Sequence, residues 1–271
     1  MKILRLLIPA ILFSGLVHAQ FPNKEFNTLL MHSTFMILGP SIEGPDKISF
    51  GTVFFMGDAR NGKFLITAAH VLEGIKGDTA TLILRRAKDD DSYETFNYDI
   101  AIRSNGRPKY IKHDTADVAV MYVNLPKGYR ISILTPEFLV TDQIIKEIDL
   151  HPGDEALCLG FPLAVSTPGG FPVLRAGRLG SYPLTPMKTV KSWIFDLFLY
   201  PGNSGGPVYY EYANRTVIGQ KVRGILGLVS QTQNSNLPEF KDKSLNLGII
   251  VPAYFIQETI DRLIATSNSQ Q

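Results

Sequence analysis

Short apolar or alternating runs recur along this chain, and turn-forming Gly, Pro, Asn or Asp residues separate them. Many runs contain β-branched or aromatic residues, which is typical of the short strands of a β-barrel or sandwich. Strands that alternate with long helices would give a different pattern. The runs that we predict as strands are Phe35–Leu38, Thr52–Met56, Phe64–Thr67, Thr81–Leu84, Val118–Val123, Glu155–Phe161, Ser192–Leu199, Pro207–Tyr210, Arg223–Val229 and Leu245–Val251. The sequence therefore predicts an all-β fold.

One segment, Ala253–Ala265, follows a helical period instead. Its apolar residues recur on one face, so we expect a C-terminal α-helix docked on a barrel, with Ser267–Gln271 as a frayed tail. The polar, proline-bearing segment 124–153 predicts a crossover between two β-rich halves, at roughly 27–130 and 145–250. With the terminal helix, the second unit covers 145–266.

The first residues are typical of a secretory signal. Lys2 and Arg5 precede the mainly apolar stretch Leu6–Leu16, and Val-His-Ala at 17–19 offers a cleavage site before Gln20. The apolar stretch is short for a membrane anchor. We expect residues 1–19 to be removed, and the mature chain to be periplasmic or extracellular and free of the membrane.

Composition excludes some function classes. The chain has 271 residues, of which 19% are charged, as in globular proteins. Lys2 and Arg5 account for the net charge of +2, so the chain without them is formally neutral. A nucleic-acid binder needs a basic face, so we expect no nucleic-acid partner.

Cys158 is the single cysteine, which excludes an intrachain disulfide in an exported protein. It lies in an apolar run, so we expect a buried strand residue rather than a reactive thiol. The charged segment 88–91, Lys-Asp-Asp-Asp, matches no reliable calcium-loop spacing. We expect a solvated hairpin tip there, and we expect no metal or other cofactor.

Ser204 lies in Gly-Asn-Ser-Gly-Gly-Pro at 202–207 and is the candidate nucleophile. A serine hydroxyl needs a base, and the base needs a carboxylate that fixes its tautomer. Gly202 permits a turn that aims backbone N–H groups inward. The segment also matches the nucleophile elbow of α/β-hydrolases, but there a histidine follows the serine, and the last histidine here is His151. An ordinary glycine-rich turn is the alternative.

His70 is the best candidate for the base. It follows the apolar strand Lys63–Thr67 and the small pair Ala68-Ala69, which lets the backbone pack closely. The other histidines lie in the signal or have no motif around them; they are His18, His32, His113 and His151.

Asp117 is the best candidate for the acid, because it directly precedes a predicted core strand and would need a partner when partly buried. Asp114 is the nearest rival, and Asp89, Asp90 and Asp91 are expected to face solvent. The alternative for Asp117 is a turn residue that starts the strand. The order His70, Asp117, Ser204 is that of chymotrypsin, whereas subtilisin runs acid, histidine, serine.

On these blocks (Thr-Ala-Ala-His at 67–70, Asp-Val-Ala-Val at 117–120 and the segment 202–207) the chain resembles the trypsin-like, chymotrypsin-fold serine peptidases. Within them it resembles the HtrA-like bacterial branch without a PDZ domain. Weaker matches at 153–154, 159–162, 227–230 and 247–252 extend the resemblance over about residues 30–265.

The resemblance implies two six-stranded antiparallel β-barrels with the active site in the cleft between them. It implies His70 as general base, Asp117 as its orienting acid, Ser204 as nucleophile, and an oxyanion hole from the N–H groups of Gly202 and Ser204. Ser230 would lie beside this triad. Leu228, Val229 and Ser230 would form a strand edge that pairs with extended substrate.

Phe198 would lie near the base of the primary specificity pocket, which favours a small-to-medium apolar side chain before the scissile bond. Asn203 stands where zymogen-activated members carry an aspartate, so we do not expect activation through a new N-terminus. The chain also ends soon after the second unit, so we expect no PDZ-driven assembly.

The sequence thus predicts a secreted serine endopeptidase that acts on protein or peptide substrates through an acyl-enzyme. One alternative is a peptide-binding or chaperone-like protein with low or regulated turnover. Another is an esterase that uses the same triad. The sequence predicts no particular oligomeric state.

Overall fold

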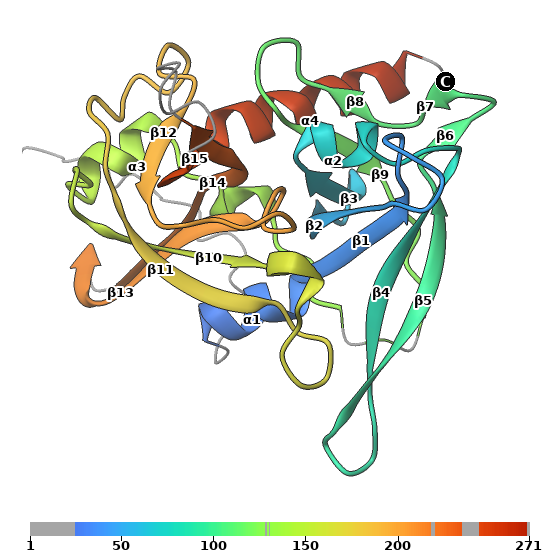
Figure 1. Cartoon of the computed structure of the whole chain (residues 1–271). Coiled ribbons are helices and arrows are strands. Elements are labelled where there is room, and N and C mark those ends of the chain that lie inside the picture. Colours follow the sequence, from blue (N-terminus) through green and yellow to red (C-terminus); the bar gives the residue numbers. More distant parts are fainter. Residues whose placement is uncertain (1–24, 128, 130, 218–219, 235–243, 270–271) are drawn as a thin grey trace, which may run out of the picture.

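The computed structural model describes residues 25–127, 129, 131–217, 220–234 and 244–269 (Figure 1). The signal peptide predicted at 1–19 lies outside this range. The described strands belong to two main antiparallel sheets and one small ribbon. The first sheet comes from the N-terminal half of the chain and the second from the C-terminal half.

The N-terminal sheet has seven strands in the order β5-β4-β1-β2-β3-β9-β8. They are β1 (Thr34–Pro40), β2 (Ile48–Asp58), β3 (Gly62–Thr67), β4 (Thr79–Ala87), β5 (Tyr93–Ala101), β8 (Ile111–Lys112) and β9 (Ala119–Tyr122). β6 (Arg103–Ser104) and β7 (Arg107–Pro108) pair separately as a two-stranded ribbon. The apolar Thr52–Met56 run lies in β2, where every side chain from Gly51 to Gly57 is buried.

The C-terminal sheet is a closed barrel in the order β10-β11-β12-β15-β14-β13. Its strands are β10 (Glu155–Gly160), β11 (Val173–Leu179), β12 (Trp193–Asp196), β13 (Pro207–Val217), β14 (Gln220–Asn234) and β15 (Ser244–Pro252). Closure leaves no unpaired sheet edge around most of this unit.

The predicted all-β class, the six-stranded C-terminal barrel and the C-terminal helix are confirmed. The N-terminal unit differs in detail, because it is a seven-stranded sheet rather than a closed barrel of six. The terminal helix α4 (Ala253–Asn268) runs past Ala265, so the tail that we predicted from Ser267 begins too early.

The shorter helices were not predicted from the sequence. They are α1 (Phe26–Ser33), α2 (Ala69–Glu73), α3 (Asp142–Glu147) and the 3₁₀ turns η1 (Pro136–Phe138) and η2 (Pro162–Ala164). These segments are too short for a helical period to stand out against the strand pattern.

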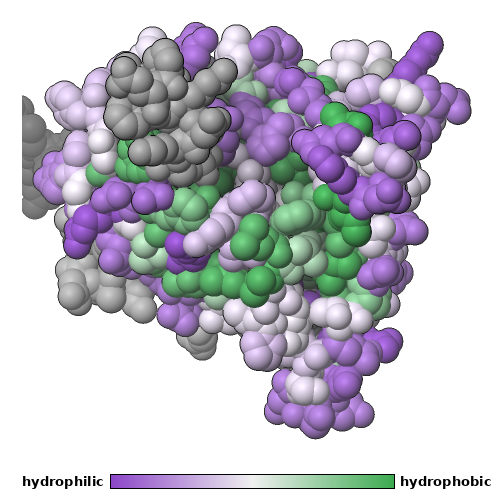
Figure 2. Space-filling model, viewed as in Figure 1, coloured by the Kyte–Doolittle hydropathy of each residue, from purple (hydrophilic) through white to green (hydrophobic). Residues whose placement is uncertain are grey.

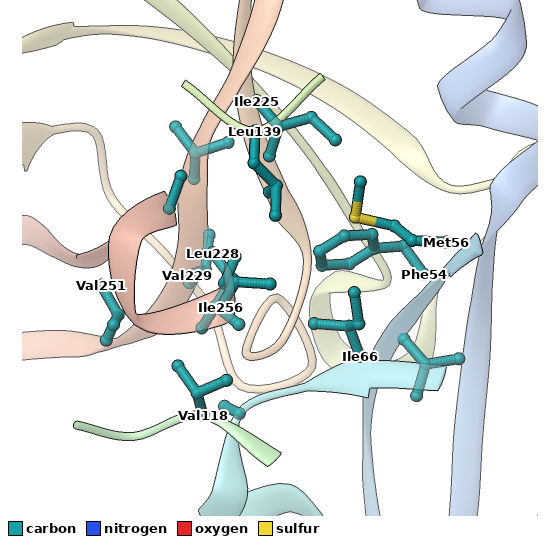
Figure 3. Close-up of a cluster of buried hydrophobic side chains, with 14 of the residues drawn as sticks. Phe54, Met56, Ile66, Val118, Leu139, Ile225, Leu228, Val229, Val251 and Ile256 are labelled. Carbon is teal, nitrogen blue, oxygen red and sulfur yellow. The ribbon is translucent and has the colours of Figure 1, made fainter. Parts of the chain in front are cut away.

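Buried side chains from both units form one core. Figure 3 shows Phe54 of β2 and Ile66 of β3 facing Leu228 and Val229 of β14, and all four are at most 1% exposed. The crossover segment also joins the units, since its Leu134 accepts a backbone hydrogen bond from β2 and its Val140 donates one to β14. The two units therefore pack directly on each other.

Helix α4 starts at the barrel and crosses to β8 and β9 of the N-terminal sheet (Figure 1). The β4–β5 hairpin protrudes from the molecule, and residues 88–91 are at its hydrophilic tip, as expected (Figures 1 and 2). Within the described residues, no helix combines the length and apolar character that a membrane crossing needs. The same residues hold no group of three or more potential metal ligands.

Candidate active site

His70 and Asp117 come together at the start of α2. His70 is the second residue of this helix, and Asp117 lies between β8 and β9. One Asp117 oxygen accepts the main-chain N–H of His70 at 3.0 Å, and the other lies 2.7 Å from His70 Nδ1. No local side chain caps α2, so the carboxylate takes up a helix N–H that would otherwise lack a partner.

A third bond comes from Ser230, whose hydroxyl donates to Asp117 Oδ2 at 2.6 Å. Burial raises the pKa of Asp117, but the hydrogen bonds and charge of His70 together with the Ser230 bond outweigh burial and hold this pKa at about 2. Asp117 is therefore anionic at neutral pH. It fixes the proton on His70 Nδ1 and leaves Nε2 as the proton acceptor.

The turn that carries Ser204 packs against the segment leading to His70. Gly205 has a φ of +85°, and a Cβ there would lie 2.1 Å from both Thr52 O and Thr67 Oγ1 and 3.0 Å from Ala68 N. Only glycine fits this contact. The glycine after Ser204 therefore lets the two units approach closely enough to bring serine and histidine segments together.

Two peptide planes beside Ser204 are fixed through their carbonyl groups. Pro201 O accepts from Leu163 N–H at 2.7 Å, and Asn203 O accepts from Gly206 N–H at 3.0 Å. In a trans peptide the N–H points opposite to the C=O, so the N–H groups of Gly202 and Ser204 point away from these partners. Among the described residues, neither N–H has a hydrogen-bond acceptor. Both are thus free to bind an anion.

Thr52 of β2 holds this turn from the N-terminal unit, and sequence reasoning missed it. Its N–H donates to Ser204 O at 2.8 Å, and its buried hydroxyl donates to Gly202 O at 2.6 Å. The same hydroxyl accepts from Phe161 N–H at 3.3 Å. A threonine in an apolar strand gave no signal of this role, because its partners are more than 100 residues away in the chain.

The expected substrate edge needs correction at two residues. Leu228 pairs with Pro207 of β13, and the N–H and C=O of Val229 bind Gly206 and Gly205. Both side chains are buried, so neither residue is free to pair with substrate. Beyond Leu228 the described pairing of β13 with β14 ends, and the edge begins at Ser230.

Phe198 lies in the loop between β12 and β13 and is half-buried. Its ring meets Tyr200 edge-on with centroids 4.4 Å apart, and its carbonyl accepts from Arg175 at 2.6 Å. Neighbouring Leu199 is buried against Gly248, where a Cβ would lie 2.3 Å from a Leu199 methyl. The surroundings of Phe198 are thus mostly apolar and aromatic.

The remaining candidates lie apart from this site. Asp114 forms an exposed ion pair with Arg262 at 3.0 Å. Cys158 is buried in β10, and burial raises the pKa of its thiol to about 12, so the expected inert strand residue is confirmed. His32 packs against Phe171, and His151 is exposed.

No family model matches the chain, and no curated protein matches it. A solved structure to which the chain is similar is the active form of the Rv3671c protease from M. tuberculosis. The two share 17% identity with a TM-score of 0.47, over 88% of this chain and 83% of that one.

Proposed function

We propose that the protein is a serine endopeptidase of the trypsin-like kind, close to the HtrA-like branch. The observation that carries the proposal is the Asp117 carboxylate bound to both the N–H and Nδ1 of His70, beside the close-packed Ser204 turn. Ser204 Oγ attacks the substrate carbonyl while His70 Nε2 takes the hydroxyl proton. His70 then protonates the leaving amine and activates the water that hydrolyses the acyl-enzyme.

The free N–H groups of Gly202 and Ser204 stabilise the developing oxyanion. Loss of one such donor typically costs about 3 kcal/mol of transition-state stabilisation. Because Leu163 and Gly206 fix both peptide planes in the absence of substrate, the donors are preorganised. A protein that only binds peptides has no use for such donors, so this feature favours turnover over a chaperone-like role.

An extended peptide adds to the edge of β14 from Ser230 and Gln231 onward, which no described residue of β13 pairs. The side chain before the scissile bond is uncharged and apolar, since Phe198, Tyr200 and Leu199 offer no acid to a basic side chain. A peptide library is expected to be cut after small-to-medium apolar residues, and cleavage confined to Lys or Arg would contradict this assignment.

Export follows from the N-terminal pattern of a basic start, an apolar stretch and Val-His-Ala at 17–19. We expect the mature protein to begin at Gln20 in the periplasm or medium. Terminal sequencing of the secreted protein tests this, and an intact Met1 on it would contradict signal cleavage.

Active-site labelling tests the central proposal. A fluorophosphonate probe is expected to modify the wild type at Ser204, as located by mass spectrometry, and to leave Ser204→Ala unlabelled. Ser104→Ala, on an exposed residue of β6, is the matched control and is expected to label normally. Peptide hydrolysis should follow labelling, and labelling that persists in Ser204→Ala would refute the assignment.

A further inference from the structure

His113 is a buried histidine on the same connection that carries Asp117. Its side chain is only 6% exposed. Nδ1 accepts the main-chain N–H groups of Thr115 at 3.1 Å and Ala116 at 3.0 Å. The N–H of His113 donates to Val118 O at 2.9 Å. His113 thus forms hydrogen bonds with residues before and after Asp117 and closes the loop of residues 114–117.

The outer side of the ring contacts α4. Nε2 lies 3.4 Å from Glu258 Oε2, and the ring meets Phe255 edge-on with centroids 5.1 Å apart. Since Nδ1 accepts two hydrogen bonds, it carries no proton, so Nε2 carries the proton and donates to Glu258. The imidazole is therefore held in one tautomer between the loop and a helix that is distant in sequence.

Further contacts join the same loop to α4. Asp114 pairs with Arg262 of the helix, and Figure 3 shows Val118 pointing toward the cluster that contains Ile256. Asp114, three residues before Asp117, thus contacts α4, and Val118, the residue after Asp117, points toward a cluster that includes a residue of α4. Asp117 itself points the other way, toward His70 and Ser230.

We propose that His113 is a positioning residue for Asp117, a role that rests on the proposed peptidase function. The His113 ring accepts hydrogen bonds from the N–H groups of the two residues before Asp117. These bonds set the direction in which the Asp117 side chain points away from the loop. Without that acceptor, two N–H groups in a partly buried turn lose their partner, and the loop relaxes. The Asp117–His70 bond then lengthens or loses alignment, although neither catalytic side chain has changed.

Two amide substitutions separate the roles of the ring nitrogens. In His113→Asn the side-chain oxygen is attached to Cγ, as Nδ1 is, so it can accept from the same N–H groups. In His113→Gln the amide is one bond further out and reaches the position of Nε2 instead. His151→Gln makes the same chemical change at an exposed histidine and is the matched control.

We expect His113→Gln to lower kcat for a peptide substrate by about 10- to 100-fold, the size that a catalytic group misplaced by about 1 Å produces. KM should change little, because the loop binds no substrate. His113→Asn should restore most of kcat, and His151→Gln should equal the wild type. The far-downfield proton resonance of His70 Nδ1–H should broaden or shift in His113→Gln and return in His113→Asn.

The proposal is overturned if His113→Gln keeps the wild-type kcat and His70 resonance. It is also overturned if both variants lose kcat equally and in proportion to their loss of thermal stability, because that indicates a purely structural role. Should His113→Gln fail to fold, nitrogen NMR of the wild type decides: an unprotonated His113 Nδ1 supports the proposal, and a protonated one refutes it.

The readouts also separate this proposal from the peptidase assignment. The His70 resonance and the His113 tautomer are measured without substrate. If the wild type hydrolyses no peptide but its His70 resonance still depends on the acceptor at position 113, the proposed function fails and the positioning role stands. If peptides are hydrolysed and the His70 resonance does not depend on the residue at position 113, the proposed function stands and the positioning role fails.

Discussion

Replacement of Thr52 by valine tests whether the N-terminal unit holds the candidate oxyanion hole in place. Valine has the shape of threonine but lacks the hydroxyl, which donates to Gly202 O at 2.6 Å and accepts from Phe161 N–H at 3.3 Å. Thr52 is fully buried, so water cannot replace the lost partner. The Thr52 N–H bond to Ser204 O remains, and only the Gly202 side of the turn is released.

The magnitude follows from these contacts. A buried polar group that loses its partner costs about 1–3 kcal/mol. Phe161 N–H and Gly202 O keep a long bond of 3.4 Å to each other, so we expect the free energy of unfolding to fall by about 2 kcal/mol, near the middle of that range. A full loss of one oxyanion donor lowers kcat by about 100- to 1000-fold. A donor that is displaced but present should lose less, so we expect a fall in kcat of about tenfold.

The assay compares Thr52→Val with Thr52→Ser, which keeps the hydroxyl and removes one methyl group. Urea unfolding gives stability, and steady-state hydrolysis gives kcat and KM. We expect both variants to be destabilised but only Thr52→Val to lose kcat, with KM nearly unchanged. Equal kcat values in the two variants would refute the idea that this hydroxyl positions the Gly202 peptide.

Three further outcomes are expected. The pKa of Asp117 is lowered from 3.8 to about 2, so the ionised carboxylate stabilises the folded protein by about 2 kcal/mol above about pH 4, and this stabilisation is lost as the pH falls toward 2. In urea unfolding, the stability of Asp117→Asn should lack this dependence on pH. The same acid profile in the wild type and the variant would contradict the prediction. The Cys158 thiol is buried and has a pKa of about 12, so it should react with a thiol reagent only after the protein unfolds. Stoichiometric labelling of the native protein would contradict the burial of this side chain. Arg85→Met should lower the free energy of unfolding by about 3 kcal/mol, because the buried guanidinium binds three carbonyl oxygens and lies between two phenylalanine rings. A urea midpoint equal to that of the wild type would count against these bonds.

Most of the longer strands were predictable because each carries its own signal, but β5 and β11 were not among the predicted runs. The apolar runs of β2, β3 and β9 reflect the burial of these strands, because buried positions favour apolar residue types. The helical face of α4 is equally local. By contrast, α2 has five residues, and it forms where Asp117, 47 residues away, accepts the N–H of His70. No window of sequence contains both halves of that interaction.

The candidate site likewise contains residues that the sequence could identify and residues that only the structure could identify. Ser204 and its glycines could be singled out from sequence because close packing admits glycine alone, as the contact of Gly205 with Thr52 shows. Leu228 and Val229 were misassigned because a strand sequence does not reveal which of its two edges is already paired. His113 had no motif around it, and its importance comes from partners on its own loop and on α4.

The sequence by itself determined the strand-rich class, the terminal helix, and the residue types and order of a histidine, an aspartate and a glycine-flanked serine. These properties depend on side-chain type and on spacing within one segment. Only the tertiary structure decided that Asp117 binds His70 and Ser230, that Thr52 anchors the turn at 202–204, and where the open edge of β14 begins. Hydrogen bonds between distant segments exist only after the two β units have packed, so no local pattern encodes them.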